Sequence, residues 1–275
     1  GDGTLDYRDV WGANENLVPA PMAVTGDGLV PSDNMLADWL GDDGVPEVAI
    51  GRLPAHTPAE LAAYRAKVIA FEASSEAWKR HTVWLADAPD EGGEFIEDIG
   101  GLIDGTPLTY SSEEIFLDRL LFEDARQQTA DALNGGALMV HFLGHGGLDR
   151  LSSNGLLTTE DVANLSNGDR SPFLAALTCM VGRFDIPDYD ILSEALLLDG
   201  GGGSVGVWSP AAFSMNSEAV QLGEHHLAAV NSGEHSTLGG SVRAALQAYA
   251  ASGEGDAELP KIFVLLGDPA TRVDW

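Results

Sequence analysis

Two apolar stretches that end in reactive side chains decide the fold: Val140-His141-Phe142-Leu143-Gly144-His145-Gly146-Gly147 and Leu174-Ala175-Ala176-Leu177-Thr178-Cys179-Met180-Val181-Gly182. Each stretch begins as a short apolar run, which is typical of a strand buried on both faces of a sheet. His145 and Cys179 follow these runs directly. Since the carboxyl ends of parallel strands meet at one edge of a sheet, we expect the imidazole and the thiol to lie close together.

Further apolar runs of strand length alternate with helical patterns along the chain. The predicted strands are 47–50, 82–86, 108–110, 137–143, 173–178, 204–208 and 262–266. The predicted helices are 57–75, a helix from about 95, 123–133, 159–165, 190–198, 216–231 and 237–251. Thr57-Pro58-Ala59-Glu60 has the pattern of a capping box at the start of the first helix. This alternation predicts an α/β fold in which a mostly parallel sheet is covered by helices on both faces.

The chain divides by composition near residue 77. Residues 1–45 are rich in Gly, Pro, Asn and Asp, which favours loops, and residues 74–80 separate the first predicted helix from the second alternating series. We therefore expect a smaller N-terminal subdomain over 1–77 and a larger one over 78–275. Gly1-Asp2-Gly3 resembles a turn whose preceding strand lies upstream, so we also expect an upstream segment.

Charge and cysteine content exclude several classes of function. The 275 residues include 14 basic and 43 acidic side chains, a net charge of −29, which argues against binding to nucleic acid or to an anionic membrane surface. It favours cationic partners, bound Ca²⁺ or a salt-rich environment. No apolar run approaches the roughly 18–20 residues of a membrane-spanning helix, so we expect no membrane insertion. The single cysteine, Cys179, excludes a disulfide within the chain and a thiolate-rich zinc site.

The expected meeting of His145 and Cys179 suggests nucleophilic catalysis. A thiol needs a nearby base to become a thiolate at neutral pH, and His145 could supply one. The backbone amides of Gly146 and Cys179 could then form an oxyanion hole. Two plainer interpretations stay open at this point, because a cysteine at a strand end also occurs as a small buried hydrophobe and a histidine between glycines as a turn residue.

The sequence resembles the gingipain family of cysteine peptidases, family C25, whose members have a caspase-like fold. Four segments carry the resemblance: Gly144-His145-Gly146; Cys179-Met180-Val181-Gly182-Arg183-Phe184; Gly51-Arg52-Leu53-Pro54 preceded by Ser32-Asp33-Asn34; and Leu266-Gly267-Asp268-Pro269. These segments are spread over almost the whole chain, so the resemblance covers both expected subdomains.

The resemblance implies a three-layer caspase-like sandwich with a smaller N-terminal α/β subdomain. It implies a secreted or cell-surface cysteine endopeptidase that forms an acyl-enzyme on Cys179, with His145 as general base and then acid. The expected partners are peptide or protein substrates and an upstream segment or prodomain. The chemistry requires no cofactor, and a structural Ca²⁺ is compatible with the many carboxylates.

The family often adds an acidic residue that orients the histidine, from the loop after the first strand of the larger subdomain. In this chain that loop holds Asp87, Asp90, Glu91 and Glu94. We expect Asp87 to take this role because it lies nearest the strand end, with Asp90 as the alternative. A solvated acidic loop and a Ca²⁺ site built from the same oxygens are competing interpretations.

The resemblance also implies a specificity pocket beside the dyad. Its expected members are Leu143, Leu177, Glu94, Trp208, Ser209 and Phe213. An acidic residue in this pocket would select Arg or Lys, and Glu94 lies where such a residue could come from, so we favour a basic P1 residue. Two alternatives are a sortase-like transpeptidase of the same fold and a catalytically silent scaffold, which would have a buried and unreactive Cys179.

Overall fold

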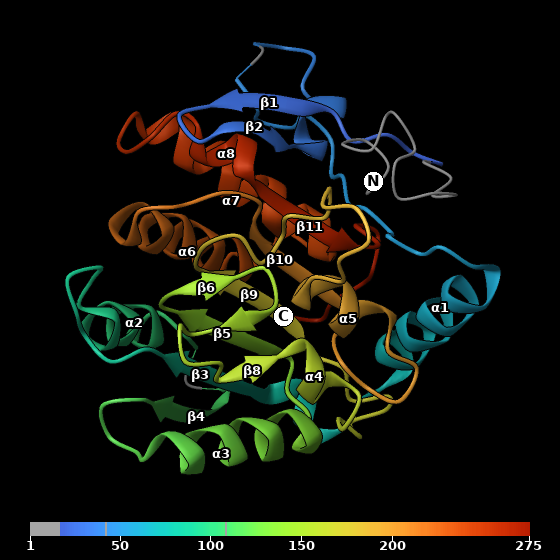
Figure 1. The fold of residues 1–275 in the computed structure, drawn as a ribbon, viewed down its shortest axis with the longest axis vertical. Coiled ribbons are helices and arrows are strands. Elements are labelled where there is room, and N and C mark those ends of the chain that lie inside the picture. Colours follow the sequence, from blue (N-terminus) through green and yellow to red (C-terminus); the bar gives the residue numbers. More distant parts are fainter. Residues whose placement is uncertain (1–16, 42, 108) are drawn as a thin grey trace.

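A six-stranded sheet forms the centre of the protein (Figure 1). The computed structural model describes residues 17–41, 43–107 and 109–275. The strand order is β11-β10-β9-β5-β3-β4. The strands are β3 (His81–Ala86), β4 (Ser111–Phe116), β5 (Met139–Leu143), β9 (Phe173–Leu177), β10 (Gly206–Pro210) and β11 (Phe263–Gly267). β11 pairs antiparallel with β10 and every other neighbouring pair in this sheet is parallel, so the predicted mostly parallel sheet is confirmed.

Helices cover both faces of this sheet (Figure 1). One layer contains α2 (Phe95–Asp104), α6 (Asn216–Asn231) and α7 (Leu238–Ser252), and the other contains α3 (Phe122–Gly135), α4 (Thr159–Val162) and α5 (Leu192–Leu198). Successive strand residues point to opposite faces. On β3, Trp84 and Ala86 therefore belong to the core cluster beneath α2, α6 and α7, whereas Val83 and Leu85 belong to the other cluster. The predicted three-layer arrangement is confirmed.

The N-terminal part packs against the end of the chain. A hairpin of β1 (Met22–Thr25) and β2 (Gly28–Pro31) leads into a 3-10 helix, η2 (Asp33–Leu36), which contacts α8 (Leu259–Ile262). α1 (Pro58–Ala73) begins at the predicted capping box and packs on α5. Its Tyr64 hydroxyl donates to the Val205 carbonyl at 2.9 Å and accepts from the Asp268 amide at 2.6 Å. A short 3-10 helix, η3 (Ala77–Arg80), connects α1 to β3. The division of the chain at residue 77 stays a prediction.

Two predicted strands are wrong. Residues 47–50 form no strand; only Arg52 joins the sheet, as a single parallel bridge to Leu266. Pro46 and Pro54 flank this segment, and a proline has no N–H to donate to a ladder. Of the predicted strand 108–110, residue 108 lies outside the described residues and 109–110 form a turn before β4.

The N-terminal residues also differ from expectation, since the loops predicted over 1–45 include the β1–β2 hairpin. The turn expected at Gly1-Asp2-Gly3 lies outside the described residues.

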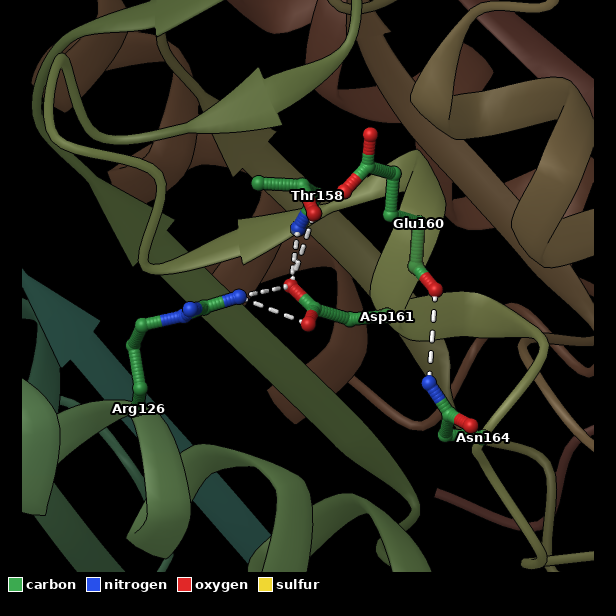
Figure 2. A network of polar contacts seen from close by, with 5 residues as sticks. All are labelled: Arg126, Thr158, Glu160, Asp161 and Asn164. Carbon is green, nitrogen blue, oxygen red and sulfur yellow. Dashed lines mark hydrogen bonds and ion pairs between the residues drawn. The ribbon is translucent and has the colours of Figure 1, made fainter.

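Directly after β5 the chain leaves the central sheet and forms a separate, smaller sheet. It forms a small sheet of β6 (Gly146–Gly147), β7 (Arg150–Leu151) and β8 (Leu157–Thr158). Figure 2 shows the polar network that anchors it: Arg126 of α3 donates to both carboxylate oxygens of Asp161, at 2.6 and 2.7 Å, and the amide and hydroxyl of Thr158 donate to the same carboxylate. The side-chain amide of Asn164 donates to the Glu160 carbonyl at 3.4 Å. The segment that follows His145 is thereby tied to α3.

Two histidines, His141 of β5 and His226 of α6, are buried in the core on the side of the sheet that α6 and α7 cover. His141 of β5 stacks on Trp84 with ring centroids 4.1 Å apart, and neither of its ring nitrogens has a hydrogen-bond partner among the described residues. Burial, and then the nearby His226, together lower the pKa of His141 to about 3. Burial also lowers the pKa of His226 to about 4. Both imidazoles are therefore held neutral in the folded protein.

We predict that the protein loses stability as the pH falls below about 6.5. The unfolded chain binds protons on these histidines near pH 6.5, whereas the folded pKa values are lower. The stability that the two neutral histidines contribute is therefore fully present above pH 6.5. It is lost as the pH falls from 6.5 toward the folded pKa values, by about 1.4 kcal/mol per pH unit for each proton. Urea unfolding between pH 7.5 and 5 measures this slope. His141→Phe should flatten it and the exposed His56→Gln should not; a slope that His141→Phe leaves unchanged would contradict this assignment.

Candidate active site

The reactive residues predicted from the sequence leave the same edge of the sheet. β5 and β9 are adjacent and parallel, with Leu143 paired to Leu177. The chain continues through Gly144 to His145 and through Thr178 to Cys179. The two loops touch, because a Cβ added to Gly146 would lie 2.5 Å from the Thr178 hydroxyl and 2.7 Å from the Cys179 carbonyl oxygen. The loops that carry His145 and Cys179 are thus in direct contact, and glycine at 146 permits it.

His145 is held through both its backbone and its ring. Its backbone N–H donates to Asp87 Oδ2 at 2.7 Å, and its Nε2 lies 2.9 Å from Asp90 Oδ2. The Phe95 ring packs against the imidazole in a T-shaped arrangement with centroids 5.3 Å apart. Because Asp90 engages Nε2, Nδ1 is the nitrogen that can exchange a proton with a reactant.

Of the two candidate acids, Asp90, the alternative, and not Asp87 contacts the ring of His145. Asp87 contacts the backbone of His145 and not its ring, because the turn at Gly144 folds directly over it: a Cβ on Gly144 would lie 2.6 Å from Asp87 Oδ2. Asp87 is buried, and burial raises its pKa. Asp90, the alternative, is the acid that meets the ring. Hydrogen bonds from the Gly92 amide and from His145 hold the pKa of Asp90 below its usual range.

The thiol of Cys179 lies in a pocket made by the loop after β10. The amide of Ser214 donates toward Sγ at 3.5 Å, and the thiol donates to the Ser214 carbonyl at 3.6 Å. Ser214 also donates its hydroxyl to the Thr178 carbonyl at 2.5 Å. Burial raises the pKa of the thiol. In this state Cys179 is therefore a neutral thiol that needs a base before it can attack.

The backbone next to the thiol is strained. Met180 adopts a left-handed conformation with φ of 64°, which is rare for a residue other than glycine. Its amide is fixed by a 3.0 Å hydrogen bond to the Ala212 carbonyl. Such strain persists only where surrounding structure enforces it, and it concentrates at functional sites.

The geometry around Gly146 bears on the expected oxyanion hole. The Ser152 amide donates to the His145 carbonyl at 2.7 Å, and Gly146 pairs with Leu151 in the next position of the antiparallel ladder. Hydrogen-bonded and non-hydrogen-bonded pairs alternate in such a ladder, so the Gly146 N–H points away from β7. It is therefore available to an acceptor outside the sheet. The oxyanion roles of Gly146 and Cys179 stay predictions.

Of the six expected pocket residues, all of which the structure describes, Phe213 lines the cavity found beside Cys179. Phe213 is 63% exposed and borders, with Cys179, a cavity of about 370 Å³. The others lie elsewhere: Leu143 and Leu177 are the buried last residues of β5 and β9, Trp208 and Ser209 are fully buried in β10, and Glu94 is the exposed residue before α2. Because Trp208 and Ser209 are enclosed, neither presents a surface to a substrate in this conformation.

Sequence reasoning missed Ser214, which contacts the thiol, and Asp27, which lines the same cavity. Asp27 lies 152 positions before Cys179, in a segment without a recognisable motif, so no local signal could have placed it there. A second cavity, of about 250 Å³, is lined by His145, Asp87 and Asp90.

The described residues also bear on metals and membranes. No three His, Cys, Asp or Glu side chains within 17–41, 43–107 and 109–275 are grouped to hold a metal ion. Structural Ca²⁺ thus stays a prediction. Over the same residues, we find no helix with the length and apolar character needed to cross a bilayer.

Comparisons with known proteins agree with this architecture. Residues 1–274 match the family described as Peptidase family C25. The crystal structure of the Arg-specific cysteine proteinase gingipain R (RgpB) matches with a TM-score of 0.79 and 20% identity, covering 93% of this chain and 61% of that chain. A complex of Porphyromonas gingivalis RgpB pro- and mature domains gives the same TM-score and identity and covers 93% of this chain and 63% of that chain.

A more distant likeness is found to a separase. A Saccharomyces cerevisiae separase–securin complex matches with a TM-score of 0.55 and 12% identity, covering 82% of this chain and 14% of that chain. No curated protein matches the sequence. The chain spans 61% and 63% of the two gingipain chains that it resembles, which is less than two thirds of their length. These likenesses confirm the gingipain-like, caspase-like fold.

We predict that Asp87 supports the fold of the site and Asp90 does not. Asp87→Ala leaves the half-buried amide of His145 without its buried acceptor, which should lower the free energy of unfolding by about 1–3 kcal/mol. The Asp90 side chain is 49% exposed, so Asp90→Ala should stay within about 0.5 kcal/mol of wild type. Urea unfolding at pH 7.5 compares the two variants. Equal losses of stability would contradict the division of roles between these acids.

Proposed function

Because the chain belongs to peptidase family C25, we propose that it is a cysteine endopeptidase that uses Cys179 and His145. The observation that carries this proposal is the contact between their two loops at the carboxyl edge of β5 and β9. The gingipain-like fold supports it, since the structural match to gingipain R covers 93% of this chain. The contact between Asp90 and Nε2 of His145 also supports it, because it leaves Nδ1 to take a proton from the thiol.

In the proposed reaction, His145 Nδ1 takes the proton of the Cys179 thiol while the sulfur attacks the carbonyl carbon of the scissile peptide bond. The amides of Gly146 and Cys179 donate hydrogen bonds to the resulting oxyanion. Collapse of this tetrahedral intermediate breaks the C–N bond, and His145 gives its proton to the leaving amine. A water molecule, deprotonated by His145, then hydrolyses the thioester and restores the thiol.

Asp90 supports the imidazole in this cycle. Its carboxylate accepts the Nε2–H, which leaves Nδ1 unprotonated toward the thiol and stabilises the imidazolium that forms. Asp87 acts indirectly by fixing the His145 backbone. Because burial raises the pKa of Cys179, the thiolate forms during the reaction under the influence of His145 and is not stored in the resting protein.

The substrate and the setting of the enzyme are parts of the same proposal. We expect a basic P1 residue, supported by the net charge of −29 and by the likeness to a proteinase described as Arg-specific. We also expect a secreted or cell-surface protein with a prodomain, as the solved complex of gingipain pro- and mature domains suggests.

Peptide hydrolysis tests this function directly. Cys179→Ala and His145→Ala should each lower kcat/KM by about 10³-fold or more, because the two residues act as a unit. Asp90→Asn should cost roughly 10²-fold, since it removes only the support of the imidazole. The assay uses fluorogenic peptides with Arg at P1, with the exposed Glu224→Gln as a control that keeps wild-type activity. Full activity in Cys179→Ala would overturn the proposal.

Mass spectrometry of the products with an added amine distinguishes hydrolysis from transpeptidation.

A further inference from the structure

The cavity beside Cys179 lies on the side of the thiol away from His145. In the sheet order, His145 follows β5 and Cys179 follows β9, whereas the cavity walls come from segments next to β10 and β11. Three parts of the chain build it: the β1–β2 turn at Thr25–Asp27, the loop Phe213–Met215, and the region of α8. The N-terminal hairpin thus completes a cavity that contains the proposed nucleophile.

The walls of this cavity carry negative charge and no positive charge. Asp27, Glu218, Asp256 and Glu258 line it, and among the described residues no Lys, Arg or His does so. Two of these carboxylates are fixed in place: Asp27 accepts from the Phe213 amide at 3.2 Å, and Glu258 accepts from the Gly26 amide at 2.8 Å. Burial, and then the charge of Asp256, raise the pKa of Glu218. A cation entering the cavity would relieve this repulsion.

The remaining walls of the cavity are apolar and open, which favours a long side chain over a metal ion as its occupant. Phe213 and Met215 are 63% and 67% exposed, and the buried Leu259 and Ile262 also line the cavity. A volume of about 370 Å³ is far larger than an ion needs, and the described residues contain no cluster of ligands arranged for one. Long basic side chains combine an apolar stem with a charged head, so Lys and Arg fit both kinds of wall.

The chemistry of the dyad decides which part of a substrate reaches this cavity. His145 must protonate the leaving amine, so the amine half lies on the side of His145, where the cavity of about 250 Å³ is found. The acyl half stays on Cys179 and extends across β10 and β11. The P1 carbonyl lies at the thiol itself, and the far walls at α8 and the hairpin lie beyond β10. The acyl half of the substrate is therefore the part that can enter, and its residues before P1 are the ones that reach these far walls.

We propose that this cavity is a subsite for a second basic residue of the substrate, at P2, P3 or P4, with Glu218 and Asp256 facing its charged head and the Thr25–Asp27 turn closing it. This inference rests on the proposed function. It makes the N-terminal hairpin part of substrate recognition, and it gives the enzyme a preference for paired or closely spaced basic residues.

Substrate pairs that differ in one charge test the subsite. Peptides with Arg at P1 carry either Arg or its neutral isostere citrulline at P2, P3 or P4. Wild type should prefer Arg at one of these positions by roughly tenfold or more in kcat/KM, the range for one charge-assisted hydrogen bond. Glu218→Gln should bring this ratio toward one. The matched variant Glu224→Gln, which removes an equal charge from an exposed position of α6, should keep it. A preference confined to P1, or a ratio that Glu218→Gln leaves unchanged, would overturn the subsite.

A second readout does not depend on peptidase activity. Cationic and anionic methanethiosulfonates, bearing trimethylammonium or sulfonate, react with the thiol of Cys179 at rates that intact-mass spectrometry can follow. The cationic-to-anionic rate ratio should fall several-fold in Glu218→Gln and in Asp256→Asn, and Glu224→Gln should leave it near wild type, because steering by an overall charge of −29 affects all variants alike. An unchanged ratio in both cavity variants would contradict the inference.

The two assays separate failure of this inference from failure of the proposed function. Hydrolysis that depends on Cys179 and shows no preference that depends on Glu218 would contradict the subsite but support the peptidase function. Absence of any hydrolysis, together with a charge ratio that depends on Glu218, removes the peptidase and leaves a cation-selective cavity around the thiol.

Discussion

The parallel pairing of β5 with β9 is the constraint on which the rest of the structure depends. It sets Leu143 beside Leu177, so that the residues two positions further on, His145 and Cys179, leave the sheet together. A shift of one residue would turn every side chain of a strand to the opposite face. Two separate apolar cores, one on each face, resist such a shift. The site is therefore positioned by core packing, and the polar contacts around it refine an arrangement that the sheet has already fixed.

The sequence was sufficient for most of the sheet but not for the details at its edge. Short apolar runs and a capping box at Thr57 are local signals, and they placed five of the six central strands and helix α1 close to where they are found. The choice between Asp87 and Asp90 depended on how the turn at Gly144 folds over the acidic loop, which is a tertiary property. Likewise, Trp208 could serve as a pocket wall or as core, and its packing against Phe263 and His226 placed it in the core.

The distribution of charge connects the fold to its proposed substrates. An overall charge of −29 repels anionic partners and favours approach of cationic ones, and the cavity beside Cys179 concentrates that property where the acyl half of a peptide would lie. The same loop after β10 supplies Ser214 to the thiol and Phe213 to the cavity. Recognition of the substrate and placement of the nucleophile thus share one short segment, which the N-terminal hairpin buttresses through Asp27.

The joint action of Cys179 and His145 is the central claim, and covalent trapping tests it most directly. A peptidyl acyloxymethyl ketone ending in Arg reacts with a cysteine when the thiol is activated and the peptide is correctly bound. Intact-mass analysis and peptide mapping should find one adduct, on Cys179, that forms in wild type and is almost absent in His145→Ala. No adduct in the wild-type protein, or equal labelling in His145→Ala, would contradict the assignment of these residues as a catalytic pair.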